Sequence, residues 1–233
     1  MKENFQVFNT EHGMILLISI VCILAILIVG KKMPQKTEYF YRLLLGAVLW
    51  GQEIALYSYR YAEGSLALSE HLPLHMCSIS VLLIPIMLYK KHKFLSNVLY
   101  FWGLGGATQA LLTPTVGAET SGFLFYQFFL SHSLIVAGVL YPIIVLAYRI
   151  DKEEFFQAIG ATIFILPFVG LANWMVGGNY FYLAHKPDAD TLLNVLGPWP
   201  LYIIPLVMIG ILIFGILYLP FPLLRSLNNK QDQ

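Results

Sequence analysis

The stretch MILLISIVCILAILIVG, residues 14–30, decides the class of fold. It contains no charged side chain, and about 18 apolar residues in a row are long enough to cross the hydrocarbon core of a bilayer. Over all 233 residues, 58% are hydrophobic and 12% are charged. A typical soluble domain carries about 25% charged residues. The sequence therefore predicts an integral membrane protein.

Seven apolar segments of this kind follow one another, which predicts an all-α, polytopic, seven-helix membrane protein with one domain over residues 1–233. The predicted helices cover residues 14–31, 38–60, 72–90, 94–113, 123–148, 154–176 and 199–224. No basic leader precedes the first segment, so we expect a membrane anchor there and no cleavable signal peptide.

The basic residues predict the orientation of these helices. If the loops alternate between the two sides, eleven of the 14 Lys and Arg residues fall on one side and three on the other. Basic residues concentrate on the cytoplasmic side of membrane proteins. We therefore expect an outside N-terminus, a cytoplasmic C-terminus and a multi-pass location in the cell membrane. The net charge of +1 provides no strong field to attract nucleic acid.

The outer loop at residues 177–198 has the signature of a short helix lying over the outer face. Asp190 is a candidate N-cap, an apolar run follows, and Gly197 with Pro198 marks the end. Tyr180 and Trp199 are among the aromatic residues that flank it, as residues at a membrane interface do. We interpret this loop as a possible lid.

Polar side chains gather in the outer halves of five predicted helices, while the inner halves are mostly aliphatic. The group comprises Gln52, Glu53, His75, Cys77, Gln109, Gln127, His132, Asn173 and Asn179. Polar groups within a bilayer are costly and usually face the interior of a bundle, so their convergence at one depth indicates a site. Individually, each has a structural alternative: Glu53 as a bonded carboxyl, the amides as links between helices, and a lone His as an interior group.

The stretch EHLPLHMCSIS, residues 70–80, places His75 and Cys77 where the third helix begins. Residues two apart on a helix point about 200° apart, so the two side chains do not share a face. His132 on the fifth helix is better placed to face Cys77 across the bundle. A Cys and a His with an orienting carboxyl or amide form the usual arrangement for thiol acyl transfer, and Glu53, Gln109 or Asn173 could orient the histidine. The alternative is that Cys77 is buried and inert.

Three motifs, LPLHMCS at 72–78, NYFYLAHKP at 179–187 and LLNVLGPWPLYI at 192–203, resemble the YwaF-type bacterial integral membrane proteins. That family is similar to the eukaryotic transmembrane-protein-164 acyltransferases. The resemblance implies a lipid-remodelling enzyme with Cys77 as nucleophile and His132 as its base. His75 lies within the matching motif, and Trp199 within another.

The sequence thus predicts a membrane-embedded acyltransferase or lipid esterase that acts on phospholipid or fatty-acyl substrates. Glu53, Gln52, Gln109, Asn173, Asn179, His75 and Trp199 are the candidate supporting or substrate-binding residues. We expect membrane lipids as partners, no protein partner, no metal and no cofactor. The alternative is a small-molecule transporter or a ligand-sensing accessory protein that binds in a polar outer pocket without reacting.

Overall fold

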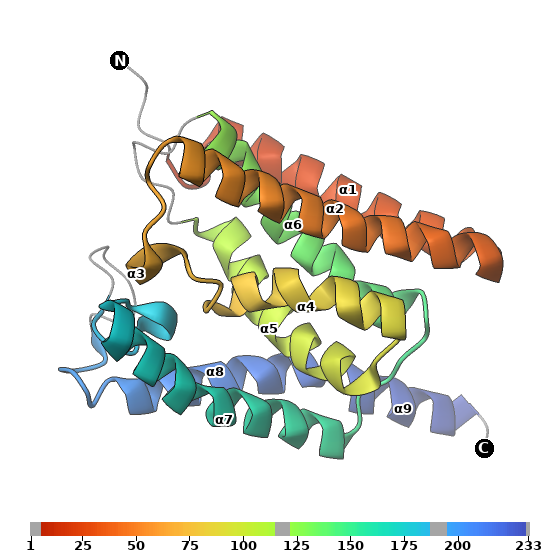
Figure 1. Ribbon diagram of the computed structural model, residues 1–233. Coiled ribbons are helices and arrows are strands. Elements are labelled where there is room, and N and C mark those ends of the chain that lie inside the picture. Colours follow the sequence, from red (N-terminus) through yellow and green to blue (C-terminus); the bar gives the residue numbers. More distant parts are fainter. Residues whose placement is uncertain (1–5, 115–121, 187–194, 232–233) are drawn as a thin grey trace. The chain divides into compact units, whose positions relative to one another are not determined.

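The computed structural model describes residues 6–114, 122–186 and 195–231, and these residues contain helices and no β-strand (Figure 1). The prediction of an all-α fold is confirmed. In chain order the elements are α1 (Thr10–Lys32), α2 (Gln35–Ala62), α3 (Leu68–His71), α4 (Met76–Lys90), α5 (Lys93–Leu112), α6 (Phe123–Ile144), α7 (Lys152–Val176), η1 (Tyr180–Tyr182), α8 (Ile203–Tyr218) and α9 (Pro220–Gln231).

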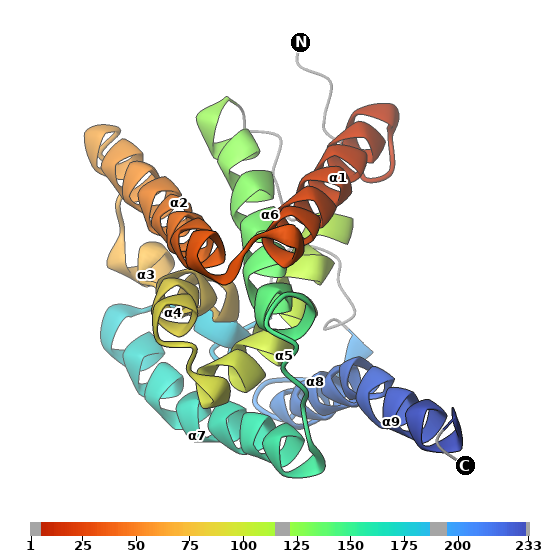
Figure 2. The ribbon, with the colours of Figure 1, turned by 90° about the vertical axis from the view of Figure 1, so that its right-hand side faces the viewer.

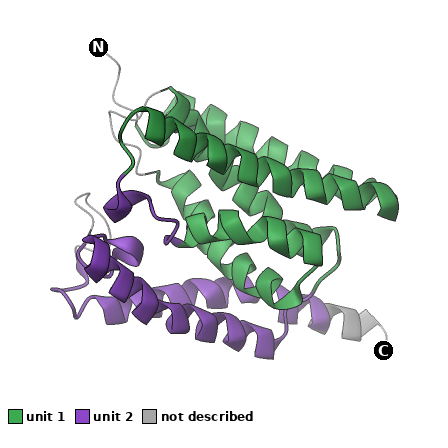
Figure 3. Cartoon of the chain, in the orientation of Figure 1, with its two compact units in different colours: residues 1–66, 76–148 green, residues 67–75, 149–233 purple. Residues whose placement is uncertain are grey.

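These elements form two compact units (Figure 3). Unit 1 consists of residues 1–66 and 76–148 and contains α1, α2, α4, α5 and α6. Unit 2 consists of residues 67–75 and 149–233 and contains α3, α7, η1, α8 and α9.

All seven predicted segments contain helix, and their ends differ from the prediction by several residues in places. The first helix begins at Thr10 instead of 14, and the last segment begins at Ile203 instead of 199. The third helix begins at Met76, because residues 72–75 form a turn in which the Leu74 amide donates to the Leu72 carbonyl at 2.7 Å. The fifth ends at Ile144 instead of 148, and the last divides into α8 and α9 at Leu219. The lid helix predicted after Asp190 falls mostly on residues 187–194, which lie outside the described residues.

Four helical stretches in the described part of the chain are long and apolar enough to cross a membrane. They are Thr10–Lys32, Phe123–Ile144, Lys152–Val176 and Ile203–Arg225. Helix α4 is also apolar but shorter, and α2 carries several charges within its length. The protein is accordingly a membrane protein.

Helices of unit 1 that follow one another in the chain run in alternating directions. Near one end, the Gln127 amide of α6 donates to the Gln52 side chain of α2 at 2.7 Å, and His12 of α1 donates from Nε2 to the Leu111 carbonyl of α5 at 2.9 Å. His12 carries its proton on Nε2 because Nδ1 accepts from a backbone amide. Near the other end, Tyr141 of α6 meets the first turn of α2. Helices α1, α4 and α6 therefore run one way, and α2 and α5 run the other.

Two glycines set the spacing of the central helices α4, α5 and α6, which lie beside one another in Figures 1 and 2. A Cβ atom on Gly138 of α6 would lie 2.7 Å from Ile84 Cγ2 of α4. A Cβ atom on Gly103 of α5 would lie 2.6 Å from Val139 Cγ1 of α6. Both positions therefore need glycine for the helices to approach this closely.

We expect Gly138→Ala to lower the free energy of unfolding by about 1–3 kcal/mol, because the added methyl group overpacks the contact with Ile84. Gly51→Ala is the matched control, since no described atom lies within 4 Å of the new methyl group. The control should be neutral or slightly stabilising, because alanine favours helix over glycine. Thermal unfolding of both variants in detergent tests this, and equal midpoints would contradict the proposed packing.

Candidate functional site

Cys77 lies in the first turn of α4, one residue after the helix begins. Its side chain is partly buried, and its Sγ lies 3.0 Å from the position that a Cβ atom on Gly106 of α5 would take. The thiol thus rests against α5. Because α4 begins later than predicted, the thiol is closer to the unpaired amide groups at the helix N-terminus than the sequence suggested.

The register of α4 against α6 places Cys77 level with His132. Ile84 of α4 lies against Gly138 of α6, and the two helices run in the same direction. Seven residues are nearly two full turns. Two turns back from this contact, α4 has Cys77 and α6 has residues 131–132.

The register of α5 against α6 also puts the thiol near the level of His132, because the thiol lies against Gly106 of α5. Gly103 lies opposite Val139, and Leu111 and Phe129 both contact His12. Between these two contacts, Gly106 lies opposite the turn of α6 that holds His132. The register of the helices therefore puts Cys77 and His132 at similar levels along unit 1, and a contact between their side chains stays a prediction.

His132 has a defined tautomer. Its Nδ1 lies 2.7 Å from the Phe128 carbonyl oxygen, which can only accept, so Nδ1 carries the proton. In the neutral imidazole, Nε2 is then the unprotonated nitrogen and the one that can act as a base. The Phe128 carbonyl thus has the orienting role that the sequence suggested for Glu53, Gln109 or Asn173. Within the described residues no hydrogen bond joins His132 to Cys77, and their pairing stays a prediction.

Gln52, Glu53 and Gln127 form a second polar group in unit 1. The Gln52 amide nitrogen donates to the Leu49 carbonyl at 3.0 Å and to Glu53 Oε2 at 3.3 Å, while its oxygen accepts from Gln127. All three side chains are buried. The predicted meeting of polar groups from different helices therefore occurs between α2 and α6.

Gln109 does not join this group. Its side chain is exposed and donates to the Thr113 hydroxyl at the end of its own helix.

In unit 2, Asn173 and Tyr180 hold the segment that precedes α4. The Asn173 amide donates to the Tyr180 carbonyl at 2.9 Å and accepts from the Tyr180 amide at 2.8 Å. The Tyr180 hydroxyl donates to the Leu68 carbonyl at 2.7 Å and accepts from the Leu72 amide at 2.8 Å. The ring of His75 packs edge-on against Tyr180 at 5.0 Å.

Tyr180 was expected at the membrane interface, but it is fully buried. Burial raises the pKa of its hydroxyl, which keeps the group protonated for its bond to the Leu68 carbonyl.

Asn179 and Trp199 also bond to backbone groups of unit 2. Asn179 Oδ1 accepts from the amides of Ala184 and His185, and its Nδ2 donates to the His185 carbonyl at 2.8 Å. Trp199 Nε1 donates to the Leu183 carbonyl at 3.0 Å. These contacts shape the turn after η1, and a role of either side chain in binding substrate stays a prediction.

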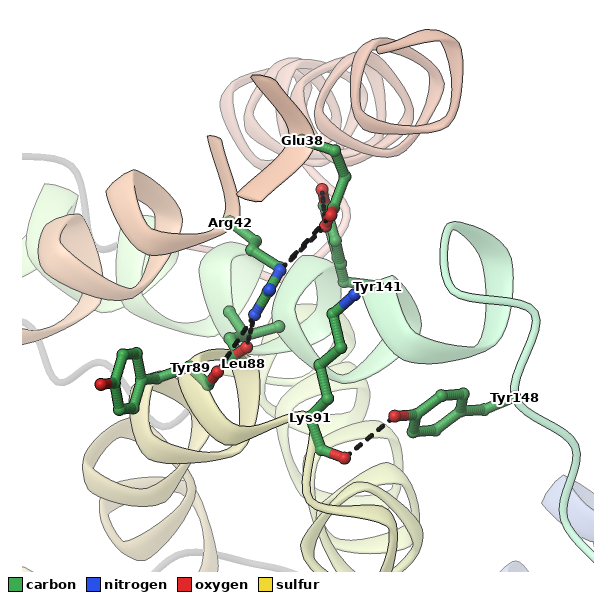
Figure 4. Close-up of polar contacts among 7 residues, drawn as sticks. All are labelled: Glu38, Arg42, Leu88, Tyr89, Lys91, Tyr141 and Tyr148. Atoms are coloured by element: carbon green, nitrogen blue, oxygen red, sulfur yellow. Dashed lines mark hydrogen bonds and ion pairs between the residues drawn. The ribbon is translucent and has the colours of Figure 1, made fainter. Parts of the chain in front are cut away.

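A buried ionic network, which was not predicted from the sequence, lies at the other end of unit 1 (Figure 4). Arg42 and Glu38, one turn apart on α2, form an ion pair at 3.1 Å with side chains that are 5% and 7% exposed. The Tyr141 hydroxyl of α6 donates to Glu38 Oε1 at 3.2 Å. The i, i+4 spacing of an acid before a base was the signal that could have predicted this pair.

The same arginine holds the end of α4. Its guanidinium donates to the carbonyls of Leu88 and Tyr89, which belong to the last turn of that helix (Figure 4). These carbonyls have no amide four residues later within the helix, and the helix dipole favours a cation there. Next to it, Tyr148 donates to the Lys91 carbonyl at 2.9 Å.

No group of three or more His, Cys, Asp or Glu residues that could hold a metal ion occurs among the described residues.

Comparison with known proteins defines the family. The model of the TMEM164 family matches residues 7–218. The chain belongs to the TMEM164 family. This confirms the resemblance seen in the three sequence motifs to the transmembrane-protein-164 proteins.

A similar protein occurs in Treponema pallidum (strain Nichols), where it is an uncharacterized protein. It is 27% identical over 150 residues, which are 64% of this chain and 62% of that protein. The chain thus spans less than two thirds of the length of this relative. No solved structure matches the chain.

We expect Arg42→Met to lower the free energy of unfolding by about 3–5 kcal/mol, because it leaves Glu38 buried and unpaired. The double variant Glu38→Gln with Arg42→Met should recover part of this loss, because it removes the buried charge as well. A double-mutant cycle measured by denaturant unfolding in detergent tests the coupling. If the two losses simply add, the ion pair contributes no coupling energy.

Proposed function

We propose that this member of the TMEM164 family is a membrane-embedded acyltransferase or lipid esterase that acts on phospholipid or fatty-acyl substrates. Cys77 is the nucleophile and His132 is the base. The observation that supports the proposal is the register of α4, α5 and α6, which puts Cys77 and His132 at similar levels of unit 1, together with the hydrogen bond of His132 Nδ1 to the Phe128 carbonyl. In the neutral imidazole this bond leaves Nε2 unprotonated and able to accept the thiol proton.

The reaction proceeds in two transfers. His132 Nε2 takes the proton of the Cys77 thiol, and the sulfur attacks the carbonyl carbon of an ester. The new C–S bond replaces the C–O bond, and the leaving hydroxyl oxygen takes the proton back from Nε2. In the second transfer, Nε2 removes a proton from an acceptor hydroxyl or water, whose oxygen attacks the thioester and releases the thiol.

The first turn of α4 supports this chemistry electrostatically. The first amides of a helix lack carbonyl partners and carry the positive end of its dipole. They stabilise negative charge on a nearby sulfur and on the carbonyl oxygen of a tetrahedral intermediate. The side chains of Gln52, Glu53 and Gln127 belong to the same end of unit 1 and supply polar groups for a lipid headgroup.

The topology that suits this function has seven spans, an outside N-terminus and a cytoplasmic C-terminus in the cell membrane. The alternating directions of the unit 1 helices support it, as does the grouping of Lys31, Lys36 and Lys91 at the end opposite Cys77. The site then lies at the level of the outer leaflet.

We expect Cys77 to form a thioester with the acyl chain of an alkyne-labelled phospholipid in membranes. Cys77→Ala should abolish the label, whereas Cys22→Ser, the matched control at the other cysteine, should keep it. His132→Ala should slow labelling by about 10²–10⁴-fold, as loss of a general base does, and His75→Ala should have a smaller effect. The measurement is in-gel detection of a label that neutral hydroxylamine removes.

Full labelling or full lipid remodelling by Cys77→Ala would overturn the proposal. Saturable lipid binding with no thioester would favour the alternative, in which the outer polar site binds a ligand without reacting.

We expect single cysteines introduced in the cysteine-free variant to report the topology. One at Ser65, after α2, should react with an impermeant maleimide in intact cells. One at Lys91, after α4, should react only after the membrane is permeabilised. The reverse pattern would invert the orientation and place Cys77 at the inner leaflet.

A further inference from the structure

Lysines are concentrated at the end of unit 1 that holds the Arg42 network. Residues 31–42 and 90–93 contain seven basic residues and one acidic residue, Glu38, which gives them a net charge of +6. Glu38 is already paired with Arg42, so it does not balance the lysines. The lysine surface, as we call it, is formed by Lys31, Lys32, Lys36 and Lys90, which are exposed, and Lys91, which is partly exposed.

These lysines come from two turns of the chain that Arg42 holds together. Its guanidinium donates to the carbonyls of the last turn of α4, directly before Lys90 (Figure 4). Lys36 lies six residues before Arg42, about 9 Å along the same helix. The turn between α1 and α2 therefore lies next to the turn between α4 and α5.

The last turn of α1 belongs to the same surface. A Cβ atom on Gly30 would lie 2.8 Å from the ring of Tyr141, whose hydroxyl donates to Glu38. Lys31 and Lys32 follow Gly30 directly and end α1. Three helix ends thus bring their lysines around one buried network.

Exposed aromatic side chains accompany the lysines. Phe40 of α2 is 61% exposed, Tyr89 in the last turn of α4 is 58% exposed, and Phe94 in the first turn of α5 is 43% exposed. Aromatic side chains near the ends of membrane helices lie at the level of the lipid headgroups. Positive charge and apolar rings side by side match a ligand that has both a phosphate and acyl chains.

We propose that the lysine surface binds the phosphodiester headgroup of an anionic phospholipid, at a site separate from Cys77. Clusters of about four to eight Lys and Arg residues next to membrane helices attract anionic headgroups. A headgroup that contacts lysines of both turns links α2 and α4 from the outside, as Arg42 links them from the inside. The site lies at the end of unit 1 opposite Cys77, so the inference does not depend on the proposed reaction.

The test measures lipid binding to the full chain in detergent by native mass spectrometry. Dioleoyl phosphatidylglycerol is the anionic probe, and dioleoyl phosphatidylcholine, with the same acyl chains, is the neutral one. The wild type should bind the anionic lipid at least about tenfold more tightly, because each lysine near a headgroup adds to the attraction.

The double variant Lys36→Gln with Lys90→Gln removes one charge from each turn. It should lower the preference for the anionic lipid by about fivefold or more. Lys36→Arg with Lys90→Arg should keep the preference, because it keeps both charges. Lys152→Gln with Lys186→Gln, the charge-matched control in unit 2, should bind both lipids as the wild type does.

Equal affinity of the wild type for the two lipids would overturn the inference and leave the lysines a role in orientation only. An equal loss of preference in the control variant would overturn it as well, because net charge and not the lysine surface would then be responsible. Displacement of the lipid by an equal concentration of soluble glycerol 1-phosphate would overturn the assignment to a lipid.

The wild type alone decides the question if the double variant does not fold. Its preference for the anionic lipid should fall at least about tenfold between about 0.1 M and about 1 M ammonium acetate, because salt screens exposed charges. A preference that does not change with salt would overturn the inference.

Discussion

The ion pair of Arg42 with Glu38 is the interaction on which the arrangement of unit 1 depends most. A charge in an apolar interior is tolerated only when its hydrogen-bonding groups are satisfied. Arg42 meets this condition by using the last carbonyls of α4, which lack partners of their own. The carboxylate of Glu38 in turn accepts from Tyr141, so one network joins α2, α4 and α6. Moving α4 along its axis would therefore break several hydrogen bonds at once.

This anchor fixes the depth of the thiol. Cys77 lies eleven residues before Leu88, a distance of about 16 Å along a helix. Farther along α4, Gly138 lets Ile84 pack against α6, and this contact sets the register between the two helices. The level of Cys77 relative to His132 therefore follows from contacts that are made two and three turns away, toward the opposite end of the unit.

The sequence predicted the helices well, because each is a long apolar run bounded by charges, Gly or Pro. The start of α4 was misjudged because Pro73 suits both a first helical turn and the turn it occupies. The candidate site was predicted in part, since Gln52 and Gln127 meet, while Gln109 faces outward. Partners that are backbone carbonyls, such as that of Phe128 for His132, have no signature in the side-chain pattern.

Buried charges were misjudged for a related reason. Arg42 was one of the eleven basic residues counted on the cytoplasmic side, and a count of charges does not distinguish an exposed lysine from an arginine inserted between helices. Tyr180 was placed at an interface because aromatic residues near a helix end usually lie there. In the structure its hydroxyl instead bonds to the backbone on either side of α3, and this contact depends on residues more than 100 positions apart.

The polar groups at the two ends of unit 1 differ in charge and in hydrogen bonding. At the Arg42 end, charges are permanent and paired, which makes the network rigid. At the Cys77 end, the thiol and His132 Nε2 have no hydrogen-bond partner among the described residues. In the proposed mechanism both groups are neutral before substrate binds, which avoids the cost of a buried ion pair. In the proposed reaction charge appears only as the thiol proton moves to Nε2, when the carbonyl of a bound ester is there to receive the electrons. The proposed reaction therefore needs two different ends of unit 1. The charged Arg42 network fixes the position of α4, and the thiol and imidazole at the other end are neutral and able to exchange a proton.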